Sequence, residues 1–447
     1  MRRVWMLLFS ALAALALAAD QVPGRGPLQL SLKRAVEIAI SPEGNTNIHL
    51  SSEALKQAKD RSLEARAQLL PDLESSFTER SQTTNLAALG ISSIRLPVLG
   101  FQFPTFVGPF KTTDARLSGT QSVLDFSSIR RFQASKAGLA AAGSDLHNTE
   151  DQVAAQAAKA YLAAVRADAD VQSEEANVRL SQAVEELAES QKRAGTGTGI
   201  EITRARVQLA NDQQRLLVAQ NTRRSARLQL LRVIGLPLDT QVELTDTLQY
   251  VPVEAVTLEE AKVRAFQQRP DYQAQRERED NARLSASAAR MERLPSLQAF
   301  GDYGALGTGL DNALATRVYG LSLRVPIFDG GRRDARRAES ASQYRAEKVR
   351  TNDLKEQIEL DVRLALDALQ SADDQVKVAK EGLELSENEL AQARRRYEAG
   401  VANGLEVTDA QTRLERARDN QTGALYNYNL ARIDLARAMG NVRGAVQ

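Results

Sequence analysis

The sequence predicts a mainly α-helical protein made of two copies of one structural unit, each with two β-strands and one long helical hairpin. First, residues 126–234 and 328–447 are alanine-rich and contain no proline, although each segment carries a glycine-bearing turn. Second, a shift of about 205 residues places Gly195 on Gly400 and Gly235 on Gly440, which indicates an internal duplication. Roughly 68 helical residues before the first turn would form a rod on the order of 100 Å. Such helices are typical of coiled coils and helical barrels.

Composition excludes several classes of function. The net charge is +1 with 26% charged residues, so we expect no nucleic-acid partner. Cysteine is absent, which excludes disulfides, thiol nucleophiles and cysteine metal sites. The two histidines, His49 and His147, have no cysteine near them, and no Ser/His/acid or paired-carboxylate cluster stands out. We therefore expect no metal, no cofactor and no enzymatic activity.

Residues 1–18 are typical of a cleaved signal peptide. Arg2 and Arg3 precede an apolar run, and Ala16-Leu17-Ala18 has the small-x-small pattern of a cleavage site. The alternative is a membrane anchor, for which the apolar run is short. No later stretch approaches about 20 apolar residues, so an exported chain would have to enter a membrane without helices.

The first repeat is predicted to span residues 19–235. Its elements, in order, are a helix at Leu30–Ile40, a helix at Ser51–Leu70, strands at about 73–85 and 115–124, and a helical hairpin at 126–235. The second helix is expected to end at Pro71, because proline cannot continue a helix. The second strand is expected to run directly into the hairpin.

Residues 236–256 form a proline-containing linker with a strand-like stretch at Gln241–Leu244. The second repeat, residues 257–440, repeats the same order: helices at 257–267 and 271–294, strands at about 297–305 and 317–327, and a helical hairpin at 328–440. A short tail, residues 441–447, follows.

The predicted strands alternate between apolar and small polar residues, the pattern of a strand that separates two solvents. In the last strand one face carries the apolar side chains that we expect to meet lipid: Tyr319, Leu321, Leu323 and Val325. Ser322 and Arg324 lie on the other face, which we expect to line a polar lumen.

Strands can cross a bilayer only as a closed barrel, because every backbone group in hydrocarbon needs a hydrogen-bond partner. Four strands cannot close, since the smallest membrane barrels use about eight. A dimer would give about eight strands around an interior filled by side chains, whereas a trimer gives about 12 and leaves room for a conduit. We therefore predict a homotrimer with a 12-stranded membrane β-barrel, continued by the long hairpins as a periplasmic α-barrel.

At this point the chain resembles the TolC-type outer-membrane efflux channels. The resemblance rests on the duplicated unit, on the junction at residues 325–331 (VPIFDGG), and on the turn that begins at residue 397 (YEAG). It implies the exit duct of a tripartite efflux pump or type I secretion system, in the outer membrane of a Gram-negative-type bacterium. It further implies outer-membrane lipid, a periplasmic adaptor protein and an inner-membrane transporter as partners.

The resemblance also implies a closed inner end that opens when partners engage. The acidic constriction residues of the family fall on Glu406 and Asp409, a tyrosine that helps hold the closed state falls on Tyr397, and an acidic residue of the first turn falls on Glu201. Ala402 stands where some members carry a basic residue, so this chain departs from the family there.

The two hairpin turns, at the far ends of the long rods, are the predicted docking sites for the adaptor. The residues assigned to docking are Gly195, Gly197, Gly199 and Ile200 in the first turn, and Gly400, Gly404 and Leu405 in the second. One alternative is that both are plain helix-reversing turns. Another, for Asp409, is an ion pair with Arg413 one turn along the same helix.

A different class of function remains to be weighed against the channel. The chain could be a soluble periplasmic coiled-coil scaffold whose strands are incidental. That protein would be a soluble rod, whereas the channel would be a trimer that requires detergent.

Overall fold

The computed structural model describes residues 27–42, 44–90, 104–254 and 256–445. The predicted signal peptide, residues 1–18, lies outside them. The chain divides into two compact units. We call them the hairpin unit, residues 1–51, 146–270 and 355–447, and the sheet unit, residues 52–145 and 271–354.

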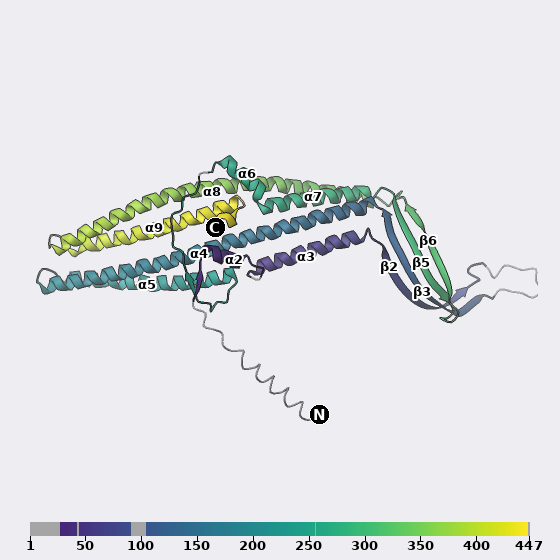
Figure 1. The fold of residues 1–447 in the computed structure, drawn as a ribbon, viewed down its shortest axis with the longest axis horizontal. Helices are drawn as coiled ribbons and strands as arrows, with labels where there is room; N and C mark the ends of the chain where they lie inside the picture. The colour runs from purple at the N-terminus through teal and green to yellow at the C-terminus, as the bar shows by residue number, and fades with distance from the viewer. Residues whose placement is uncertain (1–26, 43, 91–103, 255, 446–447) are drawn as a thin grey trace, which may run out of the picture. The chain divides into compact units, whose positions relative to one another are not determined.

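Helices make up most of the chain, and strands are few (Figure 1). Three helices have several residues in both units: α3 (Thr46–Ala67), α4 (Phe126–Arg193) and α8 (Arg332–Glu398). A fourth, α7 (Pro270–Met291), has only Pro270 in the hairpin unit. The hairpin unit also contains β1 (Leu28–Leu30), α2 (Leu32–Ala39), α5 (Gly199–Ile234), β4 (Val242–Leu244), α6 (Leu258–Gln268), α9 (Gly404–Ala438) and α10 (Val442–Ala445). The sheet unit contains β2 (Asp72–Asn85), β3 (Phe106–Leu124), β5 (Ser296–Gly307), β6 (Leu314–Arg324) and nearly all of α7 (Pro270–Met291). None of the helices in the described part of the chain combines the length with the apolarity that a membrane span requires.

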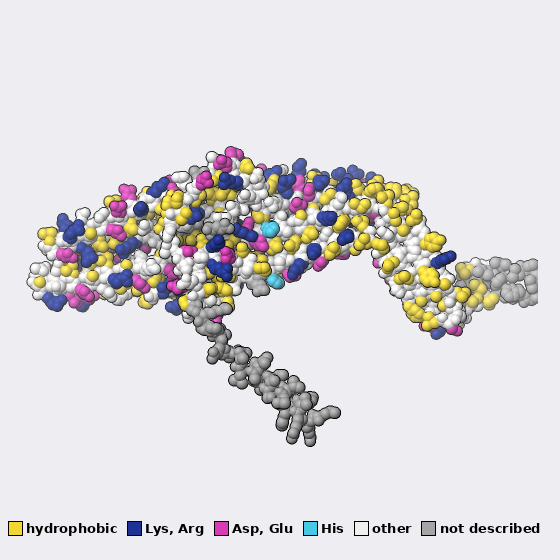
Figure 2. Space-filling model, in the orientation of Figure 1, with side chains coloured by type: hydrophobic (Ala, Val, Ile, Leu, Met, Phe, Trp, Pro, Cys, Tyr) yellow, Lys and Arg dark blue, Asp and Glu magenta, His cyan; other side chains and the backbone are white. Residues whose placement is uncertain are grey.

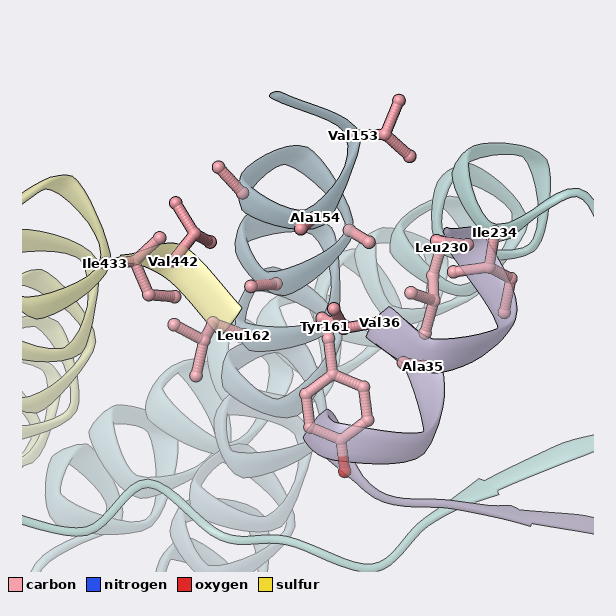
Figure 3. Packing of buried hydrophobic residues seen from close by; sticks show 14 of the residues in the cluster. Ala35, Val36, Val153, Ala154, Tyr161, Leu162, Leu230, Ile234, Ile433 and Val442 are labelled. Carbon is pink, nitrogen blue, oxygen red and sulfur yellow. The ribbon is translucent and has the colours of Figure 1, made fainter. Parts of the chain in front are cut away.

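The core of the hairpin unit forms where α2 packs against α4 and α5 (Figure 3). Alanines on α4 let the neighbouring helices approach closely, and larger side chains fill the remaining space: Val36, Tyr161, Leu230, Ile234, Ile433 and Val442. The Tyr161 hydroxyl donates to the Leu30 carbonyl oxygen at 2.9 Å, so the polar end of this buried side chain is satisfied. Leu30 belongs to β1, which pairs in parallel with β4 of the predicted linker. This core holds the hairpins at their base.

The sheet unit is built on one antiparallel sheet with strand order β2-β3-β5-β6. The register gathers apolar side chains on one face, because Leu73 lies opposite Gly119, Leu117 opposite Tyr303, and Leu297 opposite Leu323. Figure 2 shows hydrophobic side chains gathered over this part of the chain.

The other face of the sheet is polar. Ser118 lies opposite both Glu74 and Asp302, and Gln298 lies opposite Ser322. Arg116 extends the polar face with ion pairs to Asp302 and to Asp114. This face also carries two apolar side chains, Phe300 of β5 and Val318 of β6. The two faces therefore differ in polarity most clearly along β2 and β3, and less completely along β5 and β6 than the alternation in the sequence predicts.

Several predicted boundaries are wrong. Leu30, expected in the first helix, lies in β1, and α3 and α7 end at Ala67 and Met291, each three residues before the predicted end. Four further differences concern α3, β3, β6 and α8. Helix α3 begins at Thr46 rather than Ser51, because the Asn45 side chain accepts from the Asn47 N–H at 2.9 Å and starts the helix earlier. Strand β3 begins at Phe106 rather than 115, and Phe110, expected in the loop, pairs with Gln82 of β2.

The end of the last strand is the third error and the start of the following helix is the fourth. Strand β6 ends at Arg324, so Val325, expected on its lipid-facing side, lies outside it. The reason is Pro326, which has no N–H to donate to a neighbouring strand. Helix α8 then begins only at Arg332, after Gly330 and Gly331. In the first repeat the predicted direct junction is confirmed: Asp125 accepts from the Ser127 N–H at 2.9 Å and starts α4 at Phe126.

Candidate functional site

The two hairpin turns have the same backbone construction. Gly195 and Gly400 both adopt a positive φ, 82° and 71°, which favours glycine at the end of a helix. In each turn the glycine N–H donates to a carbonyl three residues back, and the next N–H donates to a carbonyl five residues back. This matched geometry confirms that the turns are equivalent positions of a duplicated unit.

The helix that follows each turn is capped by a polar side chain. Thr198 precedes α5, and its N–H donates to Glu201 Oε2 at 2.8 Å. Asn403 precedes α9, and its Oδ1 accepts from the Glu406 N–H at 3.3 Å. Gly199 and Gly404 are the first residues of these two helices. The glycines of the first turn therefore lie at two helix ends: Gly195 follows the end of α4, and Gly199 begins α5.

The two turns lie at the same end of the hairpin unit and contact each other (Figure 1). Glu201 Oε1 accepts from the Gly404 N–H at 3.4 Å, and Gln191 Nε2 donates to the Tyr397 carbonyl at 3.0 Å. We call these two contacts the tip bridge. The backbone hydrogen bond from Thr198 is the main reason why the pKa of Glu201 is lowered from its usual 4.5, and the Gly404 N–H contributes.

Tyr397 is buried beside the tip bridge. It is 3% exposed, in a cluster with Val184, Ala205, Leu390 and Val407. Burial, followed by the nearby Glu201 carboxylate, raises the pKa of the Tyr397 hydroxyl. Tyr397 therefore fills the space beneath the second turn.

Glu406 and Asp409 both lie on the exposed side of α9, whereas Val407 and Ala410 on its opposite side are buried. Glu406 pairs with Arg396 of α8 at 3.0 Å. The alternative pairing of Asp409 with Arg413 is not found, because Arg413 pairs with Glu389 of α8 at 2.8 Å. The structure thus brings Glu201 and Tyr397 together and places Glu406 and Asp409 on a separate, exposed surface.

The predicted docking turns expose apolar side chains. Ile200 is 58% exposed and Leu405 is 46% exposed, and Val401 between the two glycines of the second turn is 68% exposed. Large apolar side chains at two adjacent turns form a surface suited to contact with another protein.

Further from the turns, a charged cluster joins α4, α5 and α9, and sequence analysis did not identify it. Arg215 of α5 pairs with Glu415 of α9 at 2.6 Å, with Glu174 of α4 at 3.5 Å, and with Asp212 one turn before it. Gln208 donates to Asp212 at 3.0 Å and to Glu415 at 3.3 Å. We call these residues the Arg215 cluster.

The carboxylates of this cluster are poorly solvated. The Asp212 side chain is fully buried and also accepts from the Ser181 hydroxyl. Burial, and next the neighbouring Asp212 carboxylate, raise the pKa of Glu415 to about 7. Burial is also the main cause that raises the pKa of Asp212. The only signal in the sequence was a spacing of seven residues, which puts Asp212 on the same side of α5 as Ala205. In the structure Ala205 is buried, and Asp212 is buried with it.

Comparisons with known proteins agree with this arrangement. The family model described as "Outer membrane efflux protein" matches residues 263–441, nearly all of the predicted second repeat and the first residue after it. The pyoverdine export outer membrane protein OpmQ of Pseudomonas putida is 25% identical over 411 residues, 90% of this chain and 84% of that protein. The outer membrane protein TolC of Vibrio cholerae is 27% identical over 218 residues, 45% of this chain and 48% of that protein.

Among solved structures, the CmeC outer membrane channel of Campylobacter jejuni superposes with a TM-score of 0.77 at 18% identity, over 92% of this chain and 86% of CmeC. That likeness establishes the fold, which in these channels combines an α-barrel with a β-barrel. In sequence the chain is similar to TolC-type outer-membrane efflux proteins, through the family model over residues 263–441 and through OpmQ over 90% of its length.

Proposed function

We propose that the protein is the outer-membrane exit duct of a tripartite efflux pump or type I secretion system. It passes substrates from the periplasm or from an inner-membrane transporter to the exterior. The observation that carries this proposal is the sheet, which has one apolar and one polar face on a chain that also holds two long helical hairpins. An apolar face suits lipid and a polar face suits an aqueous lumen.

The open edges of the sheet support a homotrimer. Among the described residues, β2 and β6 each have a neighbouring strand on one side only, which leaves rows of backbone N–H and C=O groups without a sheet partner there. In hydrocarbon those groups must be paired. If β6 of one protomer pairs with β2 of the next, four strands from each of three copies close a barrel of 12.

The two hairpin turns suit the adaptor. Their exposed Ile200, Val401 and Leu405 would be covered by a partner, and the contacts between the turns hold these side chains close together. An adaptor that separated the turns would break the tip bridge. Docking and opening would then be one event.

Glu406 and Asp409 suit a cation-selective constriction. Threefold symmetry would bring six carboxylates around one axis, where such a ring attracts cations and disfavours anions. Glu201 takes a different part, because its carboxylate joins the two turns through the Thr198 and Gly404 N–H groups, whereas Glu406 has an exposed ion pair within its own hairpin, with Arg396. We assign Glu201 and Tyr397 to holding the turns together, and Glu406 and Asp409 to selectivity.

Extraction of washed membranes tests the duct against the soluble scaffold. Membranes are washed with high salt and then extracted with and without detergent, and the oligomer is fixed by chemical crosslinking. The duct remains in the membrane until detergent is added and then crosslinks as a trimer. Release by the salt wash as a rod-like monomer or dimer would instead identify the scaffold.

A further inference from the structure

The Arg215 cluster has an imbalance of charge that the proposed function does not use. One guanidinium faces three carboxylates, those of Asp212, Glu174 and Glu415. Asp212 is fully buried and Glu415 is 9% exposed, so water compensates little of the excess negative charge. If all three carboxylates were ionised, two negative charges would have no partner within the cluster.

The groups around the cluster do not restore the balance. Helix α4 adds Asp170, and α9 adds Asp419. Burial raises the pKa of both of these carboxylates. Two further cations lie nearby. Arg166 of α4 pairs with Asp170 at 3.8 Å, and Arg418 of α9 donates to the Asn177 side chain of α4 at 3.0 Å. The environment therefore favours a bound proton, and it raises the pKa of Glu415 to about 7.

The cluster lies between the two hairpins. Glu415 belongs to α9 of the second hairpin, and its partners Gln208 and Arg215 belong to α5 of the first. One turn before Glu415, Gln411 is 1% exposed on α9, and its Nε2 has no hydrogen-bond partner among the described residues. A polar and imperfectly satisfied contact between helices is easier to separate than an apolar one.

We propose that the Arg215 cluster is a proton-linked latch: α5 and α9 stay packed while Glu415 is protonated, and they separate more readily when it is ionised. Arg215 is the positioning residue that holds the Glu415 side chain against α5. The packing of α5 on α9 is a property of the hairpin unit alone. Its consequence for the gate rests on the proposed function, because α9 carries Glu406 and Asp409.

The direction of the pH effect follows from the two states of Glu415. In the packed state its pKa is about 7, whereas exposure by separation returns it to the usual 4.5. The stabilisation of the packed state is therefore complete below 4.5 and is lost as the pH rises through about 7. Within that window, one released proton lowers the ratio of packed to separated protein by about tenfold per pH unit.

The absence of cysteine makes a direct test possible, because spin labels can be attached at introduced cysteines alone. We would label Leu217→Cys on α5 and Asn420→Cys on α9 in the detergent-solubilised trimer, diluted with unlabelled protein. Pulsed electron–electron double resonance would then measure the distance between the two labels across the pH range. The wild type should give one narrow distance in acid and a growing second, longer distance toward neutral pH, with little further change above about pH 8.

Glu415→Gln copies the shape and the uncharged state of protonated Glu415, so the distance should stay short and independent of pH. Burial is the main cause of the raised pKa of Glu415, and the Asp212 carboxylate is the next. Asp212→Asn removes this second cause, so the transition should move to lower pH. Glu389→Gln is the matched control, because it removes an exposed pair between α8 and α9 and should leave the wild-type profile unchanged.

An identical pH profile in the wild type and Glu415→Gln, or separation favoured by acid, would overturn the latch. If Glu415→Gln assembled poorly, Asp212→Asn would provide the test instead. A pH transition in Asp212→Asn at the same pH as in the wild type would also overturn the latch. These distances report on the latch whether or not the protein conducts. A failed latch with normal conductance therefore leaves the proposed duct intact, and a working latch without conductance overturns only the duct.

Discussion

The Glu201 carboxylate lies between the two hairpin turns and binds both of them. One oxygen accepts from the Thr198 N–H at 2.8 Å within its own turn, and the other accepts from the Gly404 N–H at 3.4 Å in the second turn. The same side chain therefore starts α5 and holds the neighbouring hairpin. Because these hydrogen bonds lower the pKa of Glu201 from its usual 4.5, its contribution is present above 4.5 and is lost as the pH falls below that value.

Removing this carboxylate should loosen the closed end of the channel. Glu201→Ala loses a cap and the bond to Gly404, a change of about 1 kcal/mol per protomer, or roughly a fivefold shift toward separated turns. Single-channel recording should show more frequent opening at neutral pH. Glu189→Ala is the control, since Glu189 lies near the first turn but pairs across its own hairpin, with Arg206. Equal opening frequencies in the two variants would contradict the assigned part of Glu201.

Selectivity should depend on the second turn. We expect Glu406→Ala/Asp409→Ala to reduce cation preference and block by multivalent cations, because six carboxylates leave the trimer. Glu201→Ala should keep both properties, since its carboxylate is held by backbone N–H groups. Reversal potentials in a salt gradient measure the difference. Loss of cation preference in both variants, or in neither, would contradict the constriction at Glu406 and Asp409.

Gly400→Val should disrupt docking without disrupting assembly. Gly400 has a φ of 71° and no atom near the position of an added Cβ, so valine would meet backbone strain rather than a clash. We expect lost transport and lost crosslinking to the adaptor, with normal trimer levels. Gly382→Val is the matched control, because Gly382 also has open space around it but lies within helix α8. Loss of the Gly400→Val trimer would show a folding role instead.

The faces of the sheet can be tested with one pair of arginine substitutions. Leu323 and Ser322 are neighbours on β6, opposite Leu297 and Gln298 of β5, so they lie on the apolar and polar faces. Leu323→Arg should destabilise the inserted barrel by about 2–4 kcal/mol near the membrane midplane. Ser322→Arg should assemble and conduct less. Trimer yield in outer membranes measures the first effect. An unchanged yield for Leu323→Arg would show that Leu323 does not face lipid.

The sequence was sufficient to predict the repeat, the strands and the hairpins, because each has a strong local signal. Proline ended helices and strands, the alternation in β6 set its faces, and the equivalence of Gly195 with Gly400 located both turns. Errors arose where a short polar residue or a proline decided a boundary. Asn45 extended α3, and Pro326 ended β6 before Val325.

The contacts between the hairpins could not be predicted in the same way. The bond from Gly404 to Glu201 joins residues 203 positions apart, and no local pattern specifies it. Arg215 and Glu415 looked like ordinary charges on a helix surface, since charged residues are 26% of the chain. Only the packing of α5 on α9 shows that Asp212 and Glu415 are buried. The sequence predicted Glu201, Tyr397, Glu406 and Asp409 as one group of gate residues. The structure separates Glu201 and Tyr397, at the tip bridge, from Glu406 and Asp409 on an exposed surface.

Planar-bilayer conductance of the detergent-purified trimer shows whether the protein is a channel. We expect discrete current steps that prefer cations, because we propose that the polar face of the sheet lines a lumen and that Glu406 and Asp409 surround its inner end. Addition of the adaptor should prolong the open steps. A pure, crosslinkable trimer that inserts into the bilayer and passes no current, with or without adaptor, would contradict the exit duct.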